Sequence, residues 1–251
     1  MSPASYRAVL FDLFGTLLTV SPERLGELTI GPARVRSTLG SLTPAVRRWI
    51  PDATPEALWA ALATATRELG IERGPEHREF PSRERFRRAL HGLGVDASSA
   101  SEAAVHLSRA HLGRLAAATD VPESHRALLA AVASRYRVAL VSNFDDTATV
   151  LTILRAHGIE RHLPVVVVSE TVGVRKPNPA IVRVALAELD VAPGEALLVG
   201  DTFAEDVIGA HAAGVDAAWI DAGGAGVPPG ASPPRHVVRA LPEMAAILGV
   251  G

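Results

Sequence analysis

The sequence predicts an α/β fold, a doubly wound parallel sheet with helices on both faces. Short, β-branched apolar runs alternate with amphipathic stretches of helical periodicity, and turn residues bound each run. Runs of this kind are typical of parallel strands that are buried on both faces. The chain has 251 residues, 48% of them hydrophobic, so it can bury a sizeable core and still carry an insertion or a second domain.

Six apolar runs are predicted as strands: Ala8–Phe11, Val138–Val141, Pro164–Val168, Ala196–Val199, Ala217–Ile220 and His236–Val238. Helices are predicted between them at Thr147–His157, Pro179–Leu189 and Ala204–Ala213, and Gly214 would cap the last of these. Ligands of such a fold bind at the carboxyl ends of the strands. The functional residues are therefore expected in the loops that follow each strand.

Residues 19–129 have a different pattern, with several amphipathic helices and no convincing strand. The predicted helices are Pro55–Leu69 after Thr54, Arg83–Leu90 after Ser82, and one that starts at the capping box Ser99-x-x-Glu102. We therefore predict an all-α cap domain at 19–129, inserted into a core domain formed by 1–18 and 130–251.

Composition excludes several function classes. The net charge of −2 offers no basic footprint for nucleic acid, and the absence of cysteine excludes disulfides, thiolate catalysis and cysteine-bound zinc. No apolar run approaches the ~20 residues needed to cross a membrane. Arg7 and Asp12 interrupt the stretch where a signal peptide would be apolar. We expect a cytoplasmic protein without membrane or nucleic-acid partners. The sequence does not determine the oligomeric state, so a homodimer stays open.

Polar residues cluster at the ends of four predicted strands. These residues are Asp12 with Thr16, Ser142 with Asn143, Lys176 in the loop after the third of these strands, and Asp201 with Asp206. Three carboxylates brought together repel one another unless a cation is present, and oxygen-only ligands favour a hard ion. The sequence therefore predicts a Mg²⁺ site at this edge of the sheet.

Lys176 is the only lysine among 25 basic residues. A compact ammonium can pair with a nucleophilic carboxylate and with a phosphoryl oxygen, which the planar fork of arginine does less well. Ser142 and the main-chain N–H groups after Asp12 would hold the remaining phosphoryl oxygens. This arrangement indicates phosphoryl transfer through an aspartyl phosphate.

The motifs D-L-F-G-T, S-N, K-P-N-P and G-D-x-x-x-x-D occur in this order along nearly the whole chain. Together they resemble the haloacid dehalogenase superfamily, in particular the branch with a helical cap. The resemblance implies a hydrolase of small phosphorylated metabolites. It also implies a role for the motif residues. The catalytic residues would be Asp12 as nucleophile, Lys176 and Ser142 as charge and phosphate contacts, and Thr16, for which support of the loop is the alternative. Leu13, Phe14 and Asn143 would contact the substrate, and the Mg²⁺ ligands would be Asp12, Asp201, Asp206 and the carbonyl of Phe14.

Phe14 departs from the pattern, because most phosphatases of this superfamily carry an aspartate there that protonates the leaving oxygen and later activates water. General acid or base assistance is worth ~10² to 10⁴ in rate. We therefore expect reduced acid–base capacity, which would harm substrates with poor leaving groups most.

Two alternatives remain open. The first is a 2-haloacid dehalogenase, which often has an aromatic residue at the position of Phe14. The dehalogenase pattern also has a serine where this chain has Asp201, and a tyrosine near the position of Val182, and this chain has neither. A phosphate-binding or regulatory module could have kept the site and lost turnover. Among the neighbouring acids, Asp145 and Asp146 are predicted to cap the following helix, and Glu205 to be solvated.

Overall fold

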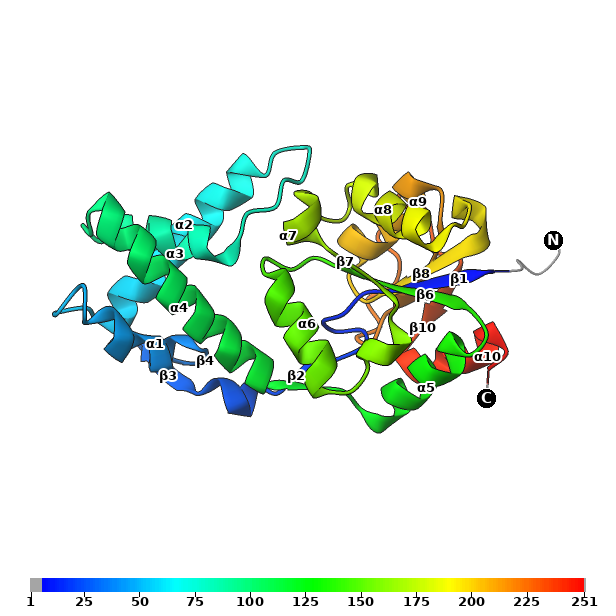
Figure 1. Ribbon diagram of the computed structural model, residues 1–251, viewed down its shortest axis with the longest axis horizontal. Helices are drawn as coiled ribbons and strands as arrows, with labels where there is room; N and C mark the ends of the chain where they lie inside the picture. The colour runs from blue at the N-terminus through cyan, green and yellow to red at the C-terminus, as the bar shows by residue number, and fades with distance from the viewer. Residues whose placement is uncertain (1–5, 251) are drawn as a thin grey trace. The chain divides into compact units, whose positions relative to one another are not determined.

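The structure, a computed structural model, describes residues 6–250. The chain divides into two compact units (Figure 1). The core unit comprises Met1–Thr19 and Asp120–Gly251, and the cap unit comprises Val20–Thr119. The insertion predicted from the sequence ended at residue 129, whereas the cap unit ends ten residues earlier, before a helix that belongs to the core unit.

A parallel sheet of six strands forms the centre of the core unit, with the strand order β10-β9-β8-β1-β6-β7. Its strands are β1 (Ala8–Phe11), β6 (Arg137–Ser142), β7 (Val165–Val168), β8 (Ala196–Gly200), β9 (Asp216–Ile220) and β10 (His236–Val238). Each of the six predicted strands is present, and the α/β prediction is confirmed. Every side chain of β1 and β8 is buried, which explains why these strands read as unbroken apolar runs.

Helices cover both faces of this sheet (Figure 1). On one face lie α8 (Pro179–Leu189) and α9 (Ile208–Ala213), whose apolar side chains share one cluster with β1 and β8. On the other lie α5 (Glu123–Ala133) and α10 (Met244–Leu248). The core unit also contains α6 (Thr147–Ala156) and the short α7 (Ser169–Val172). Helices thus cover both faces of the sheet, and a polar site is expected at the carboxyl ends of its strands.

Local capping explains where several core helices begin. The Asp146 carboxylate accepts a hydrogen bond of 2.8 Å from the Thr149 N–H and caps α6, as predicted. Asn178 caps α8 by accepting from the Ala180 N–H. The helix predicted to start at Ala204 instead begins with a π-helical turn, Phe203–Val207, which α9 continues.

The cap unit contains four α-helices, a short 3₁₀ helix (Pro22–Leu25) and a β-hairpin. The helices are α1 (Leu39–Val46), α2 (Pro55–Glu72), α3 (Ser82–Gly92) and α4 (Ala97–Ala117), and the strands of the hairpin are β3 (Glu27–Ile30) and β4 (Ala33–Arg36). The expectation of an all-α cap was therefore wrong. The hairpin lacks an apolar run because only Leu28 of its eight strand residues is buried.

Two predicted helix starts in the cap unit were also wrong. The α3 helix is preceded by Pro81, and Ser82 lies inside the helix with a buried hydroxyl that has no partner among the described residues. The α4 helix begins at Ala97, because the Asp96 carboxylate accepts from the N–H groups of Ser98 and Ser99. Asp96, three residues upstream, thus takes the capping role assigned to Ser99.

Where the chain passes between the units, β2 (Thr19–Val20) pairs with β5 (Thr119–Asp120) in a two-stranded sheet. The two connecting segments are therefore joined by main-chain hydrogen bonds. Within residues 6–250, no helix combines the length and the apolar character that crossing a membrane requires.

Candidate active site

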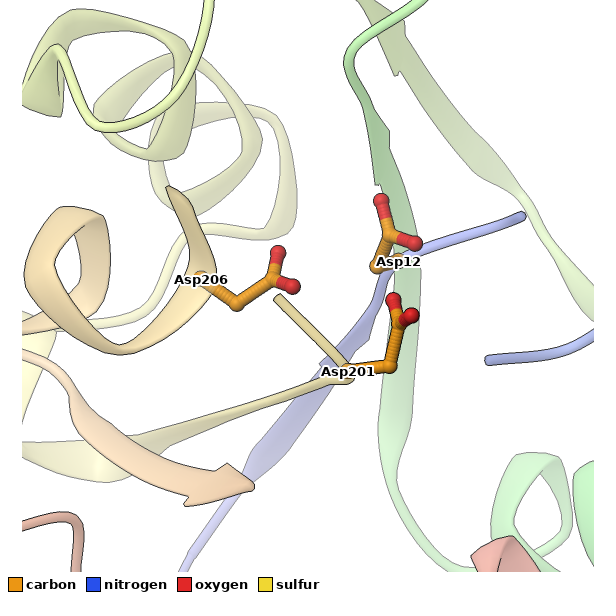
Figure 2. Close-up of side chains that lie close together, drawn as sticks. All are labelled: Asp12, Asp201 and Asp206. Carbon is orange, nitrogen blue, oxygen red and sulfur yellow. The ribbon is translucent and has the colours of Figure 1, made fainter. Parts of the chain in front are cut away.

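Three carboxylates meet at the carboxyl ends of β1 and β8 (Figure 2). Asp12 directly follows β1, and its N–H donates to the Val199 carbonyl of β8 at 2.9 Å. Asp201 directly follows β8, and Asp206 lies in the π-helical turn. One carboxylate oxygen of each residue lies within 4.8 Å of the others. The predicted convergence of these acids is present, and the π-helical turn accommodates the five-residue step between the last two.

Lys176 is buried between these carboxylates. Its Nζ donates to Asp12 Oδ1 at 2.7 Å, to Asp206 Oδ1 at 2.6 Å and to the Val141 carbonyl at 2.7 Å. An ammonium has three N–H donors, and this site uses all three in three directions. The planar guanidinium of arginine cannot reproduce that arrangement, which explains why the only lysine of the chain lies here.

Burial and mutual charge set the ionisation of this cluster. Burial raises the pKa of Asp12 to about 7, with the Lys176 ammonium opposing and Asp206 adding to the increase. For Lys176, burial alone would lower the pKa, but Asp12 and Asp206 outweigh it and raise the pKa, so the ammonium stays protonated. Burial and the charge of Asp206 also raise the pKa of Asp201. The cluster holds excess negative charge that a cation would stabilise.

Two glycines let the carboxylates approach the main chain. A Cβ on Gly200 would lie 2.1 Å from the Asp206 Cγ, and one on Gly15 would lie 2.3 Å from the Asp201 Oδ2. Gly15 also has φ 85°, which disfavours a side chain. Space therefore requires glycine in both the D-L-F-G-T and the G-D motif, and the positive φ of Gly15 is a second reason in the first of them.

Asp201 accepts two side-chain hydrogen bonds, one at its carboxylate and one at its main-chain carbonyl. Thr16 Oγ1 donates to its Oδ1 at 3.5 Å, and Trp219 Nε1 donates to its main-chain carbonyl at 2.9 Å. The Trp219 ring packs edge-on against Phe203 in the π-helical turn, with centroids 5.1 Å apart. Thr16 is fully buried and supports the carboxylate directly, a contact that the sequence suggested only as support for the loop.

Asn143 links the end of β6 to the Lys176 loop. Its Oδ1 accepts from the Lys176 N–H at 2.7 Å, and its Nδ2 donates to the Lys176 carbonyl at 3.0 Å and to Glu205 Oε2 at 2.8 Å. Arg175 pairs with Glu205 at 3.3 Å. The expectation that Glu205 is solvated was wrong. One signal of this network was available in the sequence. The two partners of Glu205, Arg175 and Asn143, lie directly beside the motif residues Lys176 and Ser142.

The other predicted substrate contacts lie around Asp12. The Phe14 ring stacks on Phe144, with centroids 4.9 Å apart and an interplanar angle of 14°. Leu13 is fully buried, and its carbonyl accepts from the Leu18 N–H at 3.0 Å. Ser142 is the buried last residue of β6 and follows Val141, the carbonyl partner of Lys176. An aromatic pair without an ionisable group thus stands two residues after Asp12.

Comparison with known proteins identifies the family. The model of the haloacid dehalogenase-like hydrolases matches residues 6–214. The chain belongs to this family. Two curated relatives are phosphatases. The phosphoserine phosphatase of Thermus thermophilus is 36% identical over 184 residues, 72% of this chain and 70% of that protein. The glyceraldehyde 3-phosphate phosphatase of Pyrococcus abyssi is 30% identical over 113 residues, 45% of this chain and 47% of that protein.

Solved structures of this family have the same fold. A 2-haloacid dehalogenase from Pseudomonas syringae matches with a TM-score of 0.73 at 21% identity, covering 97% of this chain and 98% of that one. A phosphatase from Thermococcus onnurineus matches with a TM-score of 0.64 at 25% identity, covering 97% and 98%. Fold similarity at this level extends to dehalogenases and phosphatases alike, so the reaction must be argued from the site.

The donor set of this hydrolase fits a hard divalent cation. Asp12, Asp201 and Asp206 offer carboxylate oxygens only, and two of them have a raised pKa that positive charge would lower. The nearby Lys176 neutralises part of this charge but lies against Asp12 and Asp206, and its partners do not include Asp201. The residues present could therefore hold Mg²⁺.

Proposed function

We propose that this hydrolase is a Mg²⁺-dependent phosphatase of small phosphorylated metabolites that works through an aspartyl phosphate on Asp12. The observation that carries the proposal is the buried ammonium of Lys176 between Asp12 and Asp206, with Asp201 as a third acid. Phosphoryl transfer needs a nucleophile beside positive charge, and this arrangement supplies both. The phosphatase names of the two curated relatives are in keeping with the proposal.

Each residue has a defined task in the proposed reaction. Lys176 holds Asp12 Oδ1, so Oδ2 is the oxygen that would attack phosphorus. The bond between phosphorus and the leaving oxygen then breaks, and that oxygen keeps the electron pair and takes up a proton from solvent water. Water next attacks the aspartyl phosphate, which releases inorganic phosphate and restores the carboxylate of Asp12. Bound Mg²⁺ would supply Lewis-acid charge stabilisation for the phosphoryl oxygens.

Phe14 restricts the leaving groups, because its side chain can neither give nor take the proton that this reaction moves. A leaving group that is stable as an anion, such as p-nitrophenolate or acetate, needs no proton at the moment of bond cleavage. An alkoxide does need one, and the missing assistance is worth ~10² to 10⁴ in rate. We infer that aryl and acyl phosphates are hydrolysed faster than alkyl phosphates.

The test of the reaction is hydrolysis of p-nitrophenyl phosphate and acetyl phosphate, with Mg²⁺ and with EDTA, by the wild type and by Asp12→Asn. We expect metal-dependent release of phosphate that Asp12→Asn abolishes. Turnover that survives in Asp12→Asn would refute the nucleophile. Mg²⁺-dependent binding of a phosphate analogue without turnover would favour the binding module instead, and halide release from 2-chloropropionate in EDTA would favour a dehalogenase.

The test of the leaving-group restriction is Phe14→Asp, with Phe14→Asn as a control of similar size that cannot exchange a proton at neutral pH. We expect Phe14→Asp to raise kcat/KM for phosphoserine about 10²-fold relative to p-nitrophenyl phosphate. Phe14→Asn should leave the ratio of the two substrates near the wild-type value. An equal change for both substrates would show that the ring limits access rather than proton transfer.

A further inference from the structure

A single side chain binds both main-chain groups of Lys176. Asn143 Oδ1 accepts a hydrogen bond from the Lys176 N–H at 2.7 Å, and Asn143 Nδ2 donates to the Lys176 carbonyl at 3.0 Å. A residue on a neighbouring antiparallel strand would make the same pair of contacts. The amide of Asn143 thus acts as a strand partner, and it fixes the point from which the Lys176 side chain starts.

Glu205 sets the orientation of this amide. Asn143 Nδ2 donates a second hydrogen bond to Glu205 Oε2 at 2.8 Å, and Arg175 Nη2 donates to Glu205 Oε1 at 3.3 Å. A carboxylate can only accept, so the amino group of Asn143 must face Glu205, and the amide oxygen is left to face the Lys176 N–H. Without Glu205 the amide would be free to rotate by half a turn and present a donor to that N–H.

These contacts also occupy the donors of Asn143. A side-chain amide has two N–H donors, and here one serves the Lys176 carbonyl and the other serves Glu205. A phosphoryl oxygen carries negative charge and needs a donor, which Asn143 has already committed to the protein. This geometry favours a supporting task for Asn143 over the substrate contact that the sequence predicted.

The network holds Lys176 at both of its ends. Asp206 directly follows Glu205 in the π-helical turn, and its Oδ1 accepts from Lys176 Nζ at 2.6 Å. The same turn therefore contacts the ammonium through Asp206 and the main chain through Glu205 and Asn143. A lysine side chain is long and flexible, so holding both ends removes much of its freedom to leave Asp12.

We propose that Glu205 is a positioning residue, which orients Asn143 and thereby keeps the Lys176 ammonium on Asp12 Oδ1. Asn143 is the second positioning residue of this network. The proposal rests on the phosphatase function proposed above, in which Oδ2 of Asp12 attacks phosphorus. A displaced ammonium would weaken the charge stabilisation that the transition state needs most, so kcat should fall more than KM rises.

The first experiment observes the ammonium directly. Because Lys176 is the only lysine, the full chain labelled with ¹⁵N-lysine gives a single side-chain signal in NMR. In Glu205→Ala the ammonium protons should exchange with water at least about tenfold faster than in the wild type. Glu188→Ala, the same change at an exposed position of α8, should leave the exchange rate unaltered. An unaltered rate in Glu205→Ala would overturn the proposal, whether or not the chain proves to be a phosphatase.

The second experiment is steady-state hydrolysis of p-nitrophenyl phosphate with Mg²⁺. We expect Glu205→Ala to lower kcat at least about tenfold and to change KM by less than about threefold. Glu205→Gln keeps an oxygen that can accept from Asn143, so it should recover most of the lost kcat. A change in KM alone would make Glu205 a substrate contact, and equal losses in the two variants would assign its effect to the ion pair with Arg175. Either result would refute the proposal while the phosphatase function stands.

A double-mutant cycle separates positioning from a general loss of structure. Glu205 is 33% exposed, so its truncation leaves no buried cavity, and the Tm of Glu205→Ala should stay close to that of the wild type. If Glu205 acts through Asn143, then adding Glu205→Ala to Asn143→Ala should cause no further loss of kcat and no faster ammonium exchange. Additive losses would show that Glu205 acts independently of Asn143 and would overturn the proposal.

Discussion

Both units of this hydrolase contain a cation between two carboxylates, but they place it differently. In the core unit, Lys176 lies between Asp12 and Asp206, and the three side chains are 0%, 12% and 2% exposed. In the cap unit, Arg88 lies between Glu72 and Glu84, and the corresponding values are 20%, 49% and 22%. Each cation thus pairs with two carboxylates, and the two clusters differ in their exposure to solvent. In the second cluster the pairing dominates, and Arg87 and Arg88 lower the pKa of Glu84 to about 2. In the first cluster burial dominates and raises the pKa of Asp12 to about 7.

The largest expected effect is on the buried cluster. Lys176→Met should cost ~3–5 kcal/mol of unfolding free energy, because it leaves two buried carboxylates without their cation. Arg88→Met should cost at most ~1 kcal/mol, since its partners remain hydrated. Urea unfolding in EDTA measures both. Added Mg²⁺ should narrow the gap between Lys176→Met and the wild type, and similar losses for the two variants would show that burial does not separate the clusters.

The same contrast explains which features could be predicted. All six strands and the convergence of Asp12, Lys176, Asp201 and Asp206 follow from apolar runs that end in polar residues, because parallel strands bring those ends together. The hairpin of the cap unit could not be found this way, since its strands bury only Leu28. The role of Glu205 was missed as well, because its partners Asn143 and Arg175 are distant in sequence and meet only in the folded loops.

The two units should also respond to acid with opposite sign. Burial and the charge of Arg85 lower the pKa of His111 to about 4, so the folded cap unit binds the proton of His111 less readily than the unfolded chain. Stability is then lost as pH falls from about 6.5 to about 4, by up to ~3 kcal/mol. Asp12 has a pKa raised to about 7, so the folded core unit binds its proton more readily, and stability falls as pH rises from about 4 to about 7.

Urea unfolding at pH 4.5 and pH 7 in EDTA separates these contributions. The measured quantity is the unfolding free energy lost between pH 7 and pH 4.5. This loss should be smaller in His111→Gln than in the wild type. It should be larger in Asp12→Asn, because that variant lacks the carboxyl group that gains stability as the pH falls. Because each variant is compared with the wild type at both pH values, the other titrating groups cancel. If both substitutions change the pH dependence of the unfolding free energy in the same direction, His111 and Asp12 do not have opposite effects on stability.

Glycine substitutions should also have opposite signs in the two units. Gly200→Ala would place a Cβ 2.1 Å from the Asp206 Cγ, so the carboxylate must move at a cost of about 1–3 kcal/mol, with loss of phosphatase activity. Gly113→Ala lies inside α4, where nothing stands within 4 Å of the added Cβ, and it should stabilise the chain by ~1 kcal/mol. Thermal unfolding with Mg²⁺ absent tests both. A stabilising Gly200→Ala would show that the close packing of Asp206 is not required.

The smallest effects concern helix starts, where the units should behave alike. Asp146 caps α6 in the core unit and Thr54 caps α2 in the cap unit, accepting from N–H groups at 2.8 and 3.2 Å. Alanine at either position should cost ~1 kcal/mol of unfolding free energy, somewhat more at the charged cap, Asp146.

Ser82→Ala should instead be neutral or stabilising, because the buried hydroxyl of Ser82 finds no partner among the described residues. Thermal unfolding of the three variants decides this, and a clear loss for Ser82→Ala would restore the serine to the capping role that the sequence predicted. Equal costs for Asp146 and Thr54 would mean that the units differ in how they bury charge and not in how their helices begin.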